Sequence, residues 1–127
     1  MEQYHKPFNK KVSAGTGGRR RKFKDKKLCH IGGVFAATKI AEKEVKRSVR
    51  TRGGNLMIKL KKAVSINVVT KSGTKKAKIV RVLESHNPEF VRMGIITRNT
   101  VVETDFGKVR VTNRVGQDGI VNGVLLA

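Results

Sequence analysis

Apolar and polar residues alternate through much of the second half of the chain. Leu56, Ile58 and Leu60 alternate with Met57 and Lys59, and the same two-residue period returns in later segments. A period of two is typical of strands that bury one face. The pattern predicts strands in seven segments: 56–61, 64–68, 75–82, 90–97, 100–104, 109–112 and 120–126.

Turn-forming residues separate most of these segments. Glycine, proline, asparagine and aspartate mark four connections: 71–74, 86–89, 105–108 and 113–119. Short strands at intervals of about ten residues, with turns between them, favour an all-β fold over alternating strands and helices. The sequence therefore predicts a small antiparallel β-barrel or a β-sandwich.

Segment 38–49 fits two different structures. As a helix it would have Thr38 as its N-cap and would place Ile40, Val45 and Val49 at near-helical spacing. It could equally be extended, because charged and uncharged residues alternate from position 47 onward. Both alternatives remain open at this stage.

The first 30 residues differ from the rest of the chain. Residues 1–27 hold 10 lysines and arginines, two acids and few large apolar residues. Such a segment cannot bury enough apolar surface to offset the entropy lost on ordering. We predict that residues 1–30 are a basic N-terminal extension with no fold of its own and that residues 31–127 form the β-barrel domain.

The charge balance indicates the kind of partner. Lysines and arginines number 29 and acids number 9, which gives a net charge of +20. A free globule this basic would repel itself and bind polyanions, which argues against a generic metabolic enzyme. The expected partner is a nucleic acid.

Cysteine use and hydropathy restrict the compartment. The single cysteine, Cys29, excludes an intrachain disulfide and a multi-cysteine zinc site. No apolar run approaches the ~18 residues of a membrane-spanning helix, and residues 1–9 lack the apolar stretch of a secretory signal. We expect a cytoplasmic protein with no membrane partner.

The densest group of cations lies in the extension. Arginine forks match phosphate oxygens in pairs, and lysine supplies a mobile point charge. Glycines at 17 and 18 would let the backbone approach phosphates closely. The candidate RNA-binding residues here are Arg19, Arg20, Arg21, Lys22, Lys24, Lys26 and Lys27.

A second basic cluster surrounds a glycine pair. Arg50 and Arg52 would point the same way if the backbone were extended, and Asn55 could bond a backbone or a base. The spacing is not that of a P-loop. Lys59 and Lys61 fall on the polar phase of the next strand and complete this set of candidate RNA-binding residues, although a solvated outer face is an alternative.

The polar loop at 113–119 also has two interpretations. Its asparagine and glutamine side chains could read base edges. A tight turn held by an Asx contact is the favoured interpretation, because glycine and asparagine serve both purposes there.

Catalytic and metal-binding chemistry finds no support. Cys29 and His30 are adjacent, which does not suit one tetrahedral ion, and His5 and His86 are far away in sequence. No nucleophile stands with an identifiable base and orienting group. We expect no catalytic residue, metal, cofactor or small-molecule substrate.

Several motifs together resemble the S8e family, a family of small-subunit ribosomal proteins of archaea and eukaryotes. The motifs are 17–22 (GGRRRK), 38–40 (TKI), 49–55 (VRTRGGN), 95–97 (IIT), 103–108 (ETDFGK) and 111–122 (VTNRVGQDGIVN), the last resembling the archaeal branch. The chain departs from the family pattern at Ala41, Met93, Gly94 and Val115. The resemblance implies a β-barrel with an N-terminal extension buried in ribosomal RNA, and it implies no catalysis.

The sequence thus predicts a structural constituent of the small ribosomal subunit. It would bind and stabilise small-subunit ribosomal RNA beside neighbouring ribosomal proteins. The alternative is a free-standing basic nucleic-acid-binding module, such as an RNA chaperone or a chromatin-type protein.

Overall fold

The computed structural model describes residues 3–4, 15–18, 31–70 and 72–126. The chain divides into two compact units, residues 1–35 and residues 36–127, and each is described by itself. In the first unit, β1 (Gln3–Tyr4) pairs antiparallel with β2 (Ile31–Gly32). All other elements described below belong to the second unit.

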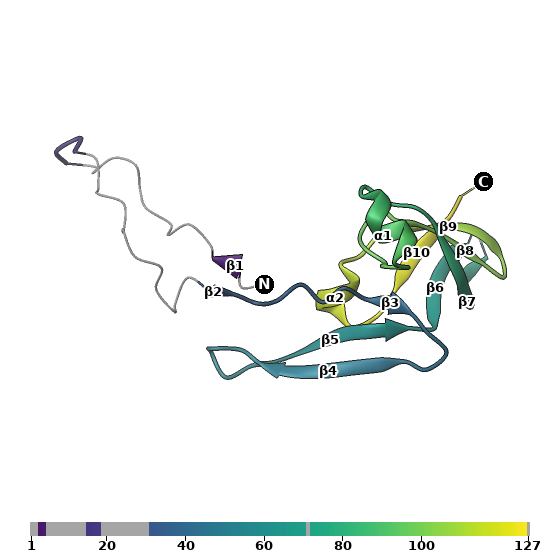
Figure 1. Cartoon of the computed structure of the whole chain (residues 1–127), viewed down its shortest axis with the longest axis horizontal. Helices are drawn as coiled ribbons and strands as arrows, with labels where there is room; N and C mark the ends of the chain where they lie inside the picture. The colour runs from purple at the N-terminus through teal and green to yellow at the C-terminus, as the bar shows by residue number, and fades with distance from the viewer. Residues whose placement is uncertain (1–2, 5–14, 19–30, 71, 127) are drawn as a thin grey trace. The chain divides into compact units, whose positions relative to one another are not determined.

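Five strands of the second unit close into a barrel (Figure 1). Around the ring the order is β10-β6-β7-β8-β9. Their bounds are β6 Ser65–Thr70, β7 Gly73–Glu84, β8 Val101–Thr104, β9 Gly107–Val111 and β10 Asn122–Leu125. The all-β prediction with a small barrel is confirmed.

One pairing in the ring is parallel, namely that of β10 with β6. The other four are antiparallel. Strand directions cannot alternate all the way around a closed ring of five, because five is odd. Closing the ring therefore requires a parallel pair. The predicted antiparallel pairing holds between all neighbouring barrel strands except β10 and β6.

Alternate side chains of the barrel strands fill its interior. Ile66 and Val68 on β6, Val102 on β8, and Val109 and Val111 on β9 are fully buried. These positions are two residues apart within each strand, as expected for one inward face. In these strands the period-two pattern that predicted them also identifies the core, whereas Leu56 and Ile58 of the first predicted strand are exposed.

A second, three-stranded sheet has the order β3-β5-β4. Its strands are β3 Lys39–Ile40, β4 Val45–Arg50 and β5 Leu56–Ala63. Segment 38–49 is therefore extended, and the helical alternative is wrong. Thr38 is buried and does not cap a helix, because its hydroxyl donates a hydrogen bond to the Leu60 carbonyl oxygen at 2.6 Å.

A short helix, α1 (Pro88–Arg92), replaces part of the loop predicted at 86–89 and of the strand predicted at 90–97. The Asn87 side chain caps it by accepting from the Glu89 backbone N–H at 3.0 Å. Pro88 stands in the first turn, where it costs no hydrogen bond. Local capping therefore overrides the apolar run that suggested a strand.

The predicted loop at 113–119 contains the one-turn helix α2 (Val115–Asp118). The Asp118 carboxylate accepts from the Arg114 backbone N–H at 3.1 Å and from the Asn113 side-chain amide at 3.0 Å. Gly119 ends the turn with φ of 73°. This is the tight, Asx-held turn favoured from the sequence. Neither described helix is long and apolar enough to cross a membrane.

Candidate nucleic-acid interface

The second cluster of candidate residues lies on one hairpin, made of β4, β5 and the turn between them (residues 45–63). The strands are antiparallel, with Arg50 opposite Leu56, Val49 opposite Met57 and Arg47 opposite Lys59. The hairpin runs past the barrel, and its turn lies away from the barrel strands (Figure 1). We call this segment the β4–β5 hairpin.

The turn of the hairpin is held by its own backbone. The Thr51 N–H donates to the Asn55 carbonyl oxygen at 2.7 Å, and the Gly54 N–H donates to the Thr51 carbonyl oxygen at 3.0 Å. Gly54 adopts φ of 88°, a conformation that favours glycine. The glycine pair predicted to permit a turn does so.

The same turn separates the two arginines. β4 ends at Arg50, and Arg52 lies in the turn. The extended backbone that would have pointed both side chains the same way is therefore not present. Arg50, Arg52 and Asn55 are all exposed near the end of the hairpin.

The hairpin is strongly and uniformly basic. Residues 45–63 contain seven lysines and arginines and no aspartate or glutamate. In the described part of the chain, Lys46 forms an ion pair with an acid just before the hairpin, its Nζ lying 3.0 Å from Glu44 Oε1. The surface of the hairpin thus has an excess of positive charge that its own residues do not neutralise.

The structure brings five predicted residues onto this element and adds three more. The five are Arg50, Arg52, Asn55, Lys59 and Lys61. Sequence reasoning missed Lys46, Arg47 and Lys62, which lie on the same two strands. The alternation in 45–50 was the signal for the first two, but the competing helical pattern left their positions undecided.

The seven candidates in the N-terminal extension cannot be compared with the hairpin. These are Arg19, Arg20, Arg21, Lys22, Lys24, Lys26 and Lys27, and they lie outside the described residues. Their proposed role therefore stays a prediction from the sequence.

Cations on the barrel are balanced more closely by acids. Arg81 on β7 forms an ion pair with Glu103 on β8, directly across the sheet. Arg92 and Glu89 pair within α1 at 2.9 Å. Residues 64–127 hold 10 cations and 5 acids, whereas the hairpin has no acid at all. Within the second unit, the charge available to a polyanion is therefore concentrated on the hairpin.

Two glycines of the 116–119 turn lie tightly against neighbouring segments of the same unit, and one of them, Gly119, faces the hairpin. A Cβ on Gly119 would lie 2.9 Å from Cγ2 of Ile58 on β5, and one on Gly116 would lie 2.7 Å from Cβ of Ala36. No side chain fits at either position without a shift of its neighbours. The 116–119 turn therefore acts in packing, by letting α2 approach β5 closely.

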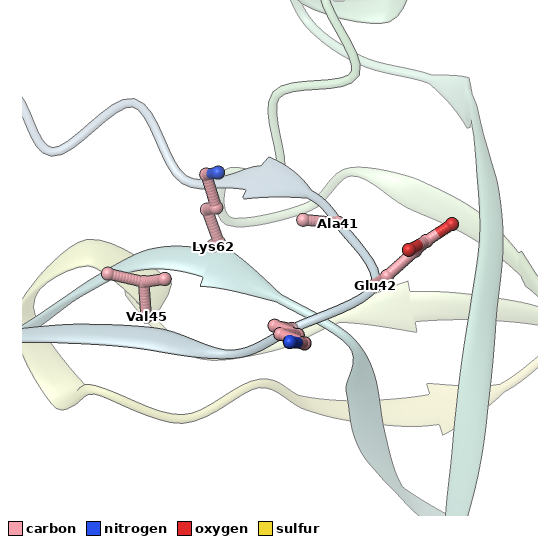
Figure 2. Close-up of a pocket in the computed structure, with 5 residues that line it drawn as sticks. Ala41, Glu42, Val45 and Lys62 are labelled. Carbon is pink, nitrogen blue, oxygen red and sulfur yellow. The ribbon is translucent and has the colours of Figure 1, made fainter.

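An open pocket lies where the β3–β4 connection meets β5, with Ala41, Glu42, Val45 and Lys62 around it (Figure 2). Lys43 completes the lining. Its titratable side chains are one carboxylate and two lysines. Among the described residues, no group of three histidine, cysteine, aspartate or glutamate side chains is placed to hold a metal ion.

Comparison with known proteins gives a consistent result. The ribosomal protein S8e family matches residues 9–126. Small ribosomal subunit protein eS8 of Nanoarchaeum equitans is 43% identical over 114 residues, covering 87% of this chain and 89% of the relative.

Two further relatives align over nearly the full length. The proteins of the same name from Ignicoccus hospitalis and Sulfolobus acidocaldarius are 43% and 40% identical over 129 residues. Each alignment covers 99% of this chain and 98% of the relative. The similarity therefore includes both the hairpin and the barrel.

Proposed function

The chain belongs to the ribosomal protein S8e family, and from that premise we propose that it is a structural constituent of the small ribosomal subunit. It is a structural protein and not an enzyme. Its task in this proposal is to bind small-subunit ribosomal RNA and stabilise the folded form of that RNA, in support of translation.

The observation that carries the RNA-binding proposal is the acid-free charge of the β4–β5 hairpin. Seven cations and no acid lie within 19 residues, on two strands that extend past the barrel (Figure 1). RNA helices are recognised largely through their shape and phosphate backbone. In this proposal Arg50, Arg52, Asn55, Lys59 and Lys61 contact the RNA.

The N-terminal extension has a separate part in the proposal. Residues 1–30 would lie within the RNA, and residues 31–127 would act as the folded domain that docks on its surface. The seven tail cations would neutralise phosphates, and the segment would order on binding. The sequence composition of residues 1–27 supports this assignment.

The location and partners follow from the same proposal. The protein would reside in cytoplasmic ribosomes, next to other proteins of the small subunit. The names of its relatives support the small subunit as its place.

Sedimentation tests the proposal directly. A tagged copy of the full chain is expected in the small-subunit peak of a sucrose gradient at low salt and again after a high-salt wash. Loss to the top of the gradient after the wash, with RNA binding retained in vitro, would instead indicate a free-standing nucleic-acid-binding module.

Salt dependence tests the role of the extension. If roughly eight phosphates are neutralised, the logarithm of the association constant should fall with log salt at a slope of about −7. Removing residues 1–27 should flatten that slope by several units and leave the urea unfolding of the remaining domain intact. An unchanged slope would show that the extension does not bind RNA.

A further inference from the structure

Two cations face each other directly on the β4–β5 hairpin. Arg47 on β4 is the register partner of Lys59 on β5. Residues opposite one another in an antiparallel pair project from the same face with their Cβ atoms about 5 Å apart. Like charges at such a pair of positions destabilise the hairpin.

Among the described residues, no carboxylate forms an ion pair with either cation. The ion pairs among the described residues join Lys46 to Glu44, Arg81 to Glu103 and Arg92 to Glu89. None includes Arg47 or Lys59, and residues 45–63 contain no acid. The free protein therefore carries an unfavourable charge pair that an external anion would convert into a favourable one.

The pair lies on the face of the hairpin that is turned away from the buried side chain of Leu60. Leu60 is opposite Lys46, one position along each strand from Lys59 and Arg47, so the two pairs project from opposite faces. The Arg47 side chain is exposed and that of Lys59 is half-buried. An incoming anion can therefore reach the pair.

An apolar pair follows on the same face. Val49 is opposite Met57, two residues along each strand from the cations, a step of about 7 Å. Met57 is 40% exposed and Val49 is half-buried. The outer face of the hairpin thus presents two adjacent positive charges beside an uncharged, apolar pair of side chains.

We propose that Arg47 and Lys59 form a phosphate-binding cation pair for the backbone of ribosomal RNA, with Val49 and Met57 packing against the attached sugar. This inference rests on the proposed function and adds a binding site to it. The Arg47 guanidinium can bond two phosphate oxygens, and the Lys59 ammonium supplies the second charge. An RNA strand satisfies both halves of the surface, because each phosphodiester is joined to a less polar sugar.

An acidic protein segment is the competing occupant of this surface. It would neutralise the cations equally well. The basic charge extends over the whole chain, to a net +20, which favours a long polyanion over one short acidic segment. The experiment below separates the two.

The test combines RNA affinity with the stability of the free protein. The full-length double variant R47Q/K59Q is titrated with purified small-subunit ribosomal RNA in filter binding at several salt concentrations. The matched control is R110Q/K76Q, which removes one arginine and one lysine from exposed positions on the barrel. Urea unfolding of each free protein is followed in parallel.

The proposal expects opposite signs in the two measurements. R47Q/K59Q should bind the RNA about tenfold more weakly than the wild type, and its salt slope should be flatter by about one unit. Its urea midpoint should rise or stay constant, because the repulsion is gone. The control should lose less than threefold in affinity, and the exchange R47K/K59R should bind like the wild type.

Three outcomes would overturn the inference. Equal losses in R47Q/K59Q and the control would show that only general charge matters, while the proposed function would stand. A lowered urea midpoint that accounts for the lost affinity would show a structural role. Unchanged RNA affinity, with loss of the variant from small subunits in a gradient, would assign the surface to an acidic protein. If the wild type binds no ribosomal RNA, the proposed function itself fails.

Discussion

The barrel and the β4–β5 hairpin are both built from β-strands, but they differ in how fully neighbouring strands cover them. In the barrel, each strand has two neighbours, and its inward side chains are enclosed. Among the described strands, β4 of the hairpin pairs only with β5 and forms the edge of its sheet. The barrel is therefore stable through its own contacts, whereas the hairpin keeps contacts available for a partner.

Isoleucines make the contrast quantitative. Ile66 in β6 has no exposed surface, whereas Ile58 in β5 is 51% exposed and Leu56 near the turn is 72% exposed. The distribution of charge shows the same division. Residues 64–127 hold one acid for every two cations, whereas the hairpin has no acid. A protein that works inside an RNA particle can leave such a surface exposed, since its partner covers it.

The largest effect should come from the same substitution made once in each region. Ile66→Ala leaves a cavity in a closed core and should lower the free energy of unfolding by about 2–5 kcal/mol. Ile58→Ala removes a side chain that is already half in water and should cost about 1 kcal/mol or less. Urea unfolding of both variants measures the difference, and equal losses would contradict the division.

A glycine substitution should reveal the same difference on a smaller scale. A Cβ on Gly123 in β10 would lie 2.5 Å from Val109 Cγ1 and 2.9 Å from the Arg110 carbonyl oxygen. Gly123→Ala should therefore cost about 1–3 kcal/mol through overpacking of the barrel. Gly53→Ala in the hairpin turn meets nothing within 4 Å and should be close to neutral, so it serves as the control. Thermal unfolding of both proteins would test this ordering.

RNA affinity should show the reverse ranking of the two regions. R50Q/K61Q removes two hairpin cations and should weaken binding about tenfold, equivalent to about 1.4 kcal/mol, with a salt slope flatter by about 1.8. Folding stability should change little, because Arg50 is exposed and Lys61 has no register partner on β4. Filter binding at several salt concentrations provides the measurement, and a barrel double variant with an equal loss would refute the ranking.

The smallest effect should come from the ion pair on the barrel wall. Arg81→Gln breaks the pair with Glu103, in which the two side chains are 69% and 38% exposed. The expected loss of stability is below about 1 kcal/mol, and it should disappear in high salt. Arg47→Gln on the hairpin should have the opposite sign, because it removes a repulsion instead of an attraction. Urea unfolding at low and high salt distinguishes them.

The barrel strands were predictable because each buries one face. In β6 and β9 the fully buried residues recur every second position, Ile66 with Val68 and Val109 with Val111, and that period is visible without a structure. Helix α1 was not predictable by period, since five residues make less than two turns. Its capping residues were present in the sequence, but proline and asparagine signal loops as well as helix starts.

The candidate interface could be predicted only in part. The cluster around Arg50 and Arg52 was visible as composition, but the structure shows that the chain turns between them. The pairing of Arg47 with Lys59 depends on the register that the 51–55 turn imposes. This register makes two residues twelve positions apart into neighbours, and the periodicity of the sequence does not predict such a pairing.

The parallel seam of the barrel also sets an order of events in time. Gly123 on β10 pairs with Val68 on β6 and with Val111 on β9, so the ring has a gap until residues 122–125 have been synthesised. The hairpin joins strands only a few residues apart and needs no later segment for its own pairing. During synthesis, the β4–β5 hairpin can therefore form on the emerging chain while the barrel is still an open sheet.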